Sequence, residues 1–249
     1  MYLSVIVFIL GAAVGSFINC QAGRIAEGVD WTKGRSHCDS CGHALGALDL
    51  IPIVSWLMHG GKCRYCGAKI PADCLFTEAG MGVLFAGLLW KFGFSWDTVV
   101  YMILVSLLLG ASLVDLKIYE IPDGYVLAGV ILWLISLLFK KEKLSALING
   151  LAGGVLIGGG MLGLSLLFDK ISGKESLGGG DIKLFFMTGL FLGPACGFFG
   201  LILSCILGIL MAGLRKEKRI PFGPSISIAA VVCLFVGTEV IQWYIGLLG

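Results

Sequence analysis

Two aspartates stand at the ends of long uncharged runs in this sequence. Asp115 closes the run 98–114, and Asp181 follows three glycines and precedes the run 184–214. An ionisable group inside a membrane is costly and is therefore a candidate for function. Two carboxylates that converge at one depth can share a proton, because like charges a few ångströms apart cannot both ionise without a penalty.

The chemistry available to such a pair is hydrolysis of a peptide bond. The ionised partner takes a proton from water as the water attacks the carbonyl, and the protonated partner polarises that carbonyl and supplies a proton to the leaving amine. The sequence contains neither G-x-S-x-G nor H-E-x-x-H, and its three histidines all lie within residues 24–74. The serine and zinc protease templates therefore do not fit this chain.

Plainer interpretations of these acidic residues stay open at this stage. Asp181 follows glycines and is suited to cap the N-terminus of a helix. Asp115 is equally well placed to be the first polar residue beyond a membrane span. Two further acidic residues in apolar surroundings, Glu78 and Glu239, are candidates for hydrogen bonding between helices, and Glu78 is also a candidate to face the site.

Four cysteines form a second cluster of chemically active residues. Cys38 and Cys41 make one C-x-x-C pair, and Cys63 and Cys66 make another after a gap of 21 residues. Each pair can hold one ion through two thiolates, and two pairs complete the tetrahedron of a closed, structural zinc site. Disulfides, a redox pair and free buried thiols are the alternatives, and a reducing compartment disfavours the first of these.

The composition indicates which elements position these residues. Hydrophobic residues make up 57% of the sequence and charged residues 14%, whereas soluble domains have about 45–50% and about 25%. A membrane span needs about 20 mostly apolar residues. We therefore predict an all-α polytopic membrane protein with about eight transmembrane helices and a small zinc-ribbon-like cytoplasmic loop domain. The expected helices cover residues 2–22, 75–93, 97–114, 124–139, 145–168, 181–193, 195–213 and 224–247.

Three parts of the chain follow from this pattern. Residues 1–23 are predicted to form the first transmembrane helix, 24–74 a cytoplasmic four-cysteine metal-binding loop, and 75–249 the multi-helix membrane core. Within the core, Gly193-Pro194 is expected to break the run 184–214, which is too long for one span.

The distribution of basic residues predicts the orientation in the membrane. The loops 24–74, 115–123, 169–183 and 214–223 fall on one side and carry 14 of the 18 Lys and Arg residues. The positive-inside rule places this side, and with it the loops next to Asp115 and Asp181, in the cytoplasm. The net charge of +2 gives no indication of nucleic-acid binding, and membrane lipid is the expected surrounding.

Five short stretches of the sequence occur in the order found in one family. These are "GSFINC", the paired C-x-x-C loop, "DLKIYEIPD", "GGGDIK" and "PFGPS". In these motifs the chain resembles bacterial type IV prepilin peptidases, which are polytopic aspartyl proteases of the GxGD class. The similarity extends over nearly the whole chain. By matching motifs, Asp115 and Asp181 correspond to the family's catalytic aspartates, and Gly178, Gly180 and Lys183 to residues that support the catalytic loop.

The resemblance also implies a substrate and a second activity. Members of this family remove the short basic leader from type IV prepilins or pseudopilins at the cytoplasmic face of the bacterial inner membrane. Many then methylate the new N-terminus with S-adenosylmethionine as methyl donor, and the paired-cysteine loop is typical of this bifunctional form. No residues that bind the methyl donor can be assigned from the sequence.

Two functions from other classes compete with this hypothesis. A proton-coupled transporter would also use membrane carboxylates and glycine-rich helices, but it predicts an internal repeat and carboxylates near the midplane. A non-enzymatic assembly factor would tolerate loss of either aspartate. A protease assay on single-aspartate variants separates these hypotheses.

Overall fold

The computed structural model consists of helices joined by short connections and one long loop. It describes residues 2–173, 177–214 and 220–248, and these contain no named strand, only two isolated β-bridges. Helices suit an apolar chain in lipid because every backbone polar group is satisfied within the segment. The predicted all-α class is confirmed.

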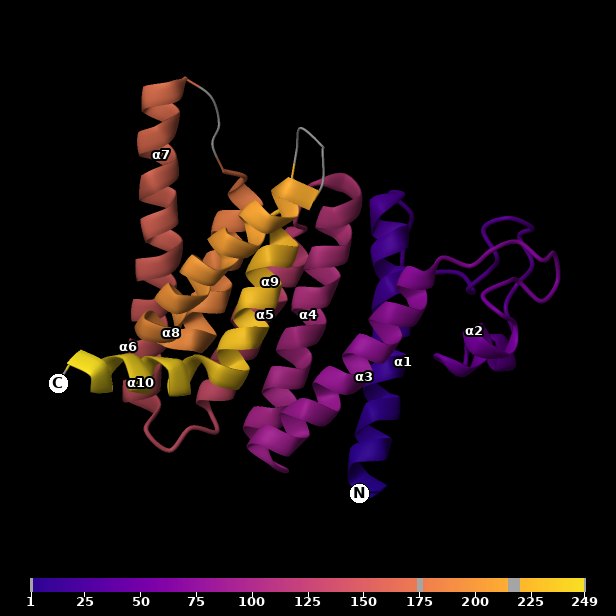
Figure 1. Ribbon diagram of the computed structural model, residues 1–249, viewed down its shortest axis with the longest axis horizontal. Helices are drawn as coiled ribbons and strands as arrows, with labels where there is room; N and C mark the ends of the chain where they lie inside the picture. The colour runs from indigo at the N-terminus through magenta and orange to yellow at the C-terminus, as the bar shows by residue number, and fades with distance from the viewer. Residues whose placement is uncertain (1, 174–176, 215–219, 249) are drawn as a thin grey trace. The chain divides into compact units, whose positions relative to one another are not determined.

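The helical elements are shown in Figure 1 with their labels. In chain order they are α1 (Tyr2–Ala26), η1 (Ala47–Leu50), α2 (Val54–Met58), α3 (Ala72–Phe92), α4 (Trp96–Ile118), α5 (Asp123–Leu137), α6 (Lys143–Gly154), η2 (Val155–Gly159), α7 (Gly160–Ser172), α8 (Gly179–Leu214), α9 (Gly223–Val232), η3 (Cys233–Gly237) and α10 (Thr238–Leu248).

Six helical stretches of the described chain are long and apolar enough to cross a membrane. They are α1, α3, α4, the continuous stretch α6–η2–α7, α8, and the stretch formed by α9, η3 and α10. The shorter α5 is also apolar. The protein is therefore a multi-pass membrane protein, and the number of eight crossings stays a prediction.

The long helix α8 contains the break that the sequence predicts. Gly193 has φ 71° and ψ −179°, which is not helical, and Pro194 follows it. Beyond the break the chain reverses direction. Gly197 lies back beside Gly189, since an ideal Cβ at Gly197 would be 3.9 Å from the Cα of Gly189. The two halves of α8 thus form a helical hairpin, as expected for helices at 181–193 and 195–213.

The chain divides into two compact units, Met1–Met102 and Ile103–Gly249. In the first unit α1 packs closely on α3, because Gly11 and Gly15 face the backbone carbonyls of Met81 and Thr77. The second unit contains both Asp115 and Asp181. The three parts predicted from the sequence, with boundaries at residues 23 and 74, describe functional parts rather than compact units and stay a prediction.

Glycines allow α6 and η2 to pack closely on the first half of α8. A Cβ at Gly153 would collide with the carbonyl oxygen of Gly189, and a Cβ at Gly189 would lie 2.7 Å from the carbonyl oxygen of Gly153. A Cβ at Gly158 would lie 2.6 Å from the Cβ of Phe186. Small residues let helix backbones approach in this way, which is how helices associate in lipid.

This contact leads to a testable prediction about stability. Gly189→Ala should lower the free energy of unfolding by about 1–3 kcal/mol, because the new methyl group meets a backbone atom that cannot move aside. Gly163→Ala is the matched control: Gly163 lies in α7 with nothing within 4 Å of an ideal Cβ, and alanine there should stabilise the helix by about 0.5–1 kcal/mol. Unfolding in mixed micelles measures both changes, and equal stability of the two variants would contradict the packing described.

Candidate functional site

Asp115 lies in the last turn of α4, where the chain turns sharply out of the helix. Its carbonyl oxygen accepts a hydrogen bond of 2.9 Å from the N–H of Tyr119, and Tyr119 has φ 57°, in the left-handed region. A residue in this conformation commonly ends a helix. The side chain of Asp115 is 4% exposed, so its carboxylate is buried.

The Asp115 carboxylate is fixed by the N-terminus of another helix. Its Oδ2 accepts a hydrogen bond of 2.8 Å from the backbone N–H of Gly223, the first residue of α9. Along the same pair of helices, Ser112 Oγ donates to Ser227 Oγ at 2.8 Å. These two buried bonds hold α4 against α9 and restrict the position of the Asp115 side chain.

Asp181 lies in the first turn of α8 and has an unpaired buried oxygen. Its N–H donates to the carbonyl oxygen of Gly178 at 3.1 Å. Its Oδ1 is buried and has no hydrogen-bond partner in the described part of the chain. Asp115 is near enough for its charge to act on the Asp181 carboxyl group. The structure thus brings the two aspartates into one site.

Two contacts join the segment after α4 to the start of α8. An ideal Cβ at Gly180 would lie 3.0 Å from the Cβ of Ile121. Lys183 Nζ lies 2.7 Å from Asp123 Oδ1, and both side chains are more than half exposed. These contacts connect the parts of the chain that carry Asp115 and Asp181, which lie far apart in the sequence.

The site gathers the residues expected from the sequence and adds three others. Gly178, Gly180 and Lys183 all lie beside Asp181 or contact the segment after Asp115. Reasoning from the sequence assigned no role to Gly223, Ser112 or Ser227. The signal for Gly223 was the stretch "PFGPS", because a proline just inside a helix start marks a helix N-terminus whose free N–H groups can bind a carboxylate.

The four cysteines of residues 24–74 form a second site with two matching halves. In the first half, the N–H of Cys38 donates to the carbonyl oxygen of His43 at 3.0 Å, and the N–H of Gly42 donates to the carbonyl oxygen of Cys38 at 2.8 Å. In the second half, the N–H of Cys63 donates to the carbonyl oxygen of Ala68 at 2.8 Å, and the N–H of Gly67 donates to that of Cys63 at 2.9 Å. Gly42 and Gly67 both have positive φ, 69° and 72°. The two C-x-x-C pairs therefore form equivalent turns.

These turns aim four thiols at one point. The Sγ atoms of Cys38, Cys41, Cys63 and Cys66 all lie within 4.8 Å of one another, and those of Cys38 and Cys66 are 3.8 Å apart. A tetrahedral ion with bonds of about 2.3 Å places its sulfur ligands about 3.8 Å apart. Backbone N–H groups of Cys41 and Ser40 lower the pKa of the Cys38 thiol, whereas burial and the neighbouring thiols raise the pKa of Cys66. The cluster could hold a metal ion.

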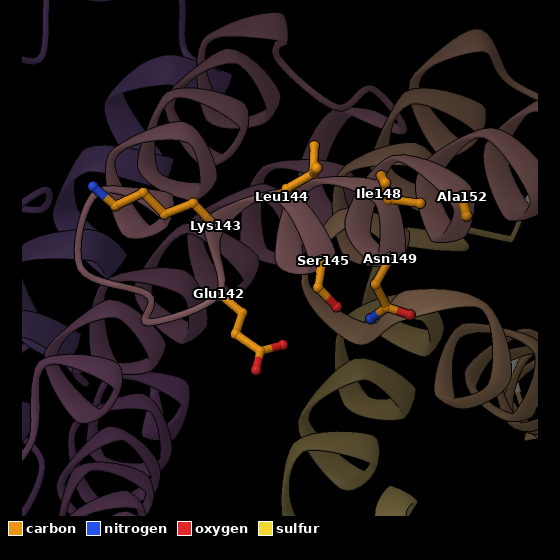
Figure 2. Close-up of a pocket in the computed structure, with 7 residues that line it drawn as sticks. All are labelled: Glu142, Lys143, Leu144, Ser145, Ile148, Asn149 and Ala152. Carbon is orange, nitrogen blue, oxygen red and sulfur yellow. The ribbon is translucent and has the colours of Figure 1, made fainter.

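A depression of about 700 Å³ on the surface is lined by none of the residues of either site. It is lined by residues of one stretch, from Glu142 to Ala152. Figure 2 shows Ser145 and Asn149 pointing to one side of α6, and Leu144 and Ile148 to the other. The start of α6 lies at the Gly193 end of the α8 hairpin, opposite the end that carries Asp181, so this depression belongs to neither site.

The fold and its sites define a class of protein: a multi-pass membrane protein with a buried pair of carboxylates and a separate four-thiol loop. Residues 9–92 match the bacterial peptidase A24 N-terminal domain, and residues 102–213 match the type IV leader peptidase family. Together with the relatives described next, these matches show that the chain belongs to the type IV leader peptidase family.

Relatives of known name match over nearly the whole length. A prepilin leader peptidase/N-methyltransferase of Stutzerimonas stutzeri is 30% identical over 267 residues, covering 95% of this chain and 92% of the relative. The protein of that name in Bacillus subtilis is 30% identical, with coverage of 96% and 97%. The one in Aeromonas hydrophila is 30% identical, with coverage of 98% and 94%. No solved structure matches the chain.

Proposed function

We propose that this membrane protein cuts the leader peptide from type IV prepilins or pseudopilins and then N-methylates the new N-terminus. Membership of the type IV leader peptidase family and the shared name of its relatives support both activities. The observation that carries the peptidase proposal is the buried carboxylate pair, because it supplies an acid and a base without any metal or nucleophilic side chain.

Asp115 and Asp181 divide the acid and base roles in this proposal. Asp115 accepts a hydrogen bond from the N–H of Gly223 at the start of α9, and the N-terminus of a helix favours a negative charge. We therefore assign Asp115 the part of the ionised base that takes a proton from the attacking water. Asp181, whose Oδ1 has no partner in the described chain, holds the proton that polarises the scissile carbonyl and then passes to the leaving amine.

The residues around the pair position it. Gly178 and Gly180 leave room at the start of α8, where a side chain would press on Asp181 or Ile121. The ion pair between Lys183 and Asp123 links the start of α8 to the segment after α4. This arrangement supports the role that the family motif gives to Gly178, Gly180 and Lys183.

The cleavage site of the substrate fits the position of the pair along the chain. Asp115 stands at the end of α4 and Asp181 at the start of α8, so both lie where a span meets the membrane surface. The positive-inside rule assigns this surface to the cytoplasm, where a basic leader precedes the apolar helix of a prepilin. We therefore propose that cleavage takes place at the cytoplasmic face of the inner membrane.

Residues 24–74 form a separate functional part in this proposal, between the helix of residues 1–23 and the membrane core of residues 75–249. Four thiol ligands in a tetrahedron leave no open position on the ion, so the role of zinc is structural. The loop has few buried apolar side chains of its own, and metal binding then contributes to its folding.

The metal site gives a direct prediction. Purified, reduced protein should contain about one zinc ion per chain, and Cys38→Ser or Cys66→Ser should release it, because each removes one of four ligands. Cys20→Ser is the control, since Cys20 is a free cysteine outside the cluster. Elemental analysis measures the metal, and a freshly purified wild-type protein without it would rule the site out.

For the methyl transfer we propose S-adenosylmethionine as the donor. The reaction needs a free N-terminal amine, which cleavage provides, and it does not need the acid and base that activate water. Methylation of an already cleaved pilin should therefore proceed independently of the aspartates.

A purified protein incubated with a prepilin in lipid vesicles tests the proposed function. Release of the leader, followed by a gain of one methyl group on the pilin, is the expected result. A transporter or an assembly factor would leave the prepilin intact.

A further inference from the structure

A short apolar stretch of the loop between α1 and α3 has the properties of a segment that lies in lipid. Residues 50–58, "LIPIVSWLM", contain no charged residue. Three apolar side chains of α2 are exposed, with exposed fractions of 47% for Val54, 60% for Leu57 and 77% for Met58, whereas Trp56 is partly buried. Ile51 is 41% exposed. In water, such a continuous apolar surface would be unfavourable.

A buried carboxylate attaches this stretch to the side of α3. Glu78 is 8% exposed, and its Oε2 accepts a hydrogen bond of 2.6 Å from the backbone N–H of Ile53. Ile53 has φ 64°, a conformation that is costly for a β-branched residue. The contact therefore holds the chain in a conformation that it would not adopt alone.

The point of attachment lies well inside the span of α1. An ideal Cβ at Gly15 would lie 2.7 Å from the carbonyl oxygen of Thr77 and 3.2 Å from the Cα of Glu78, so Glu78 is level with Gly15. Gly15 precedes Arg24 by nine residues, which is about 14 Å along a helix. The hydrocarbon core of a bilayer is about 30 Å thick. Ile53 is therefore held near the level of Gly15, which lies well inside the apolar run of α1.

The first part of the same loop is attached at a different level. Arg24, in the last turn of α1, donates to the carbonyl oxygens of Lys33 and Arg35, each at 3.0 Å. The Lys33 side chain is 84% exposed. The loop thus has a polar part at the end of α1 and an apolar part about 14 Å further along the helix. In Figure 1, α2 is drawn at about the level of the middle of α1 and α3.

Four backbone N–H groups at and just before the start of α2 have partners, which favours entry of this stretch into lipid. A segment in the hydrocarbon core must satisfy its polar backbone groups internally. Pro52 has no N–H, the N–H of Ile53 is bound by Glu78, and the N–H groups of Val54, Ser55 and Leu57 bind carbonyl oxygens of the same stretch.

We propose that residues 50–58 are embedded in the membrane beside α1 and α3, with lipid acyl chains against Val54, Leu57 and Met58 and with Glu78 as the anchor. The loop is thereby fixed to the bilayer at a third point besides its two ends. This inference does not depend on the enzymatic activity.

Depth-dependent fluorescence quenching tests the proposal. A fluorescent amino acid replaces Leu57 in the full chain, and in a second protein it replaces Lys33; both proteins are reconstituted in vesicles. Lipids brominated on their acyl chains should quench the fluorophore at position 57 several-fold more than that at 33, and aqueous iodide should show the reverse order. Position 58 serves as a second site, in case the substitution at 57 disturbs folding.

Glu78 provides the matched pair of variants. Glu78→Gln keeps a carbonyl oxygen that can accept the hydrogen bond from the N–H of Ile53. Quenching at position 57 by brominated lipids and by iodide should therefore stay as in the wild type. Glu78→Ala removes the acceptor and should make the fluorophore several-fold more accessible to iodide. Strong iodide quenching at 57 in the otherwise unchanged protein would overturn the proposal. Protection from both quenchers would overturn it as well, because protein rather than lipid would then cover this surface.

Discussion

Asp115→Asn and Asp181→Asn should each lower the rate of prepilin cleavage by about 10⁴-fold, because either amide removes the acid or the base from a pair that works only together. The double variant should be no slower than either single variant, since residues that act as a unit are strongly non-additive. Steady-state cleavage of a prepilin in vesicles measures all three rates. If the rate of the double variant fell by the product of the two single losses, the aspartates would act in separate steps.

Asp123→Asn is the control for these changes. Asp123 is a carboxylate of the same region, but its side chain is 75% exposed and binds Lys183 rather than the pair. Exposed ion pairs contribute about 0–1 kcal/mol, and asparagine still offers an oxygen to Lys183. Asp123→Asn should therefore retain substantial activity.

Gly223→Ala should lower the cleavage rate by about 10²-fold. A Cβ at Gly223 would lie 2.8 Å from Oδ2 of Asp115 and 3.3 Å from its Cβ. The carboxylate would have to move away from the N–H that holds it, and a displacement of about 1 Å can cost about 10²-fold in rate. The protein should still fold, because the strain falls on one side chain.

Gly179→Ala is the matched control for the glycines of the site. Gly179 lies in the same glycine run as Gly178 and Gly180, yet nothing lies within 4 Å of an ideal Cβ there. Gly178→Ala would place a methyl group 3.0 Å from Oδ2 of Asp181 and should be slower than Gly179→Ala. Single-turnover cleavage ranks these variants, and equal rates for Gly223→Ala and Gly179→Ala would contradict the geometry.

The sequence predicts the two aspartates of the site better than it predicts the groups that hold them in position. Asp115 and Asp181 are candidates because an ionisable group inside a membrane is costly, and because the stretches "DLKIYEIPD" and "GGGDIK" that contain them resemble a family with two catalytic aspartates. The partner of Asp115 is a backbone N–H of Gly223, 108 residues away. The stretch "PFGPS" indicates a helix N-terminus with free N–H groups, but it does not indicate which carboxylate they bind. The serines that join α4 and α9 are equally ordinary in the sequence. Such support depends on which helices lie side by side, and apolar periodicity does not determine that.

The fold shows the same division between local and long-range information. Gly193-Pro194 is a local signal, and the structure contains the break and reversal predicted there. The turns at Gly42 and Gly67 likewise follow from their own residues. By contrast, the attachment of Ile53 to Glu78 joins a loop to a helix, whereas the sequence left Glu78 as a candidate either to bond to a neighbouring helix or to face the site. The partner of a buried carboxylate becomes clear only when the chain is folded.

The central claim is that Asp115 and Asp181 together cut the peptide bond, and the intact mass of the substrate tests it most directly. Folded Asp115→Asn and Asp181→Asn proteins, each with its zinc content unchanged, are incubated with a prepilin and, separately, with an already cleaved pilin and S-adenosylmethionine. We expect the prepilin mass to stay constant in both cases, whereas the cleaved pilin gains one methyl group. Removal of the leader by either folded variant would contradict the aspartyl mechanism.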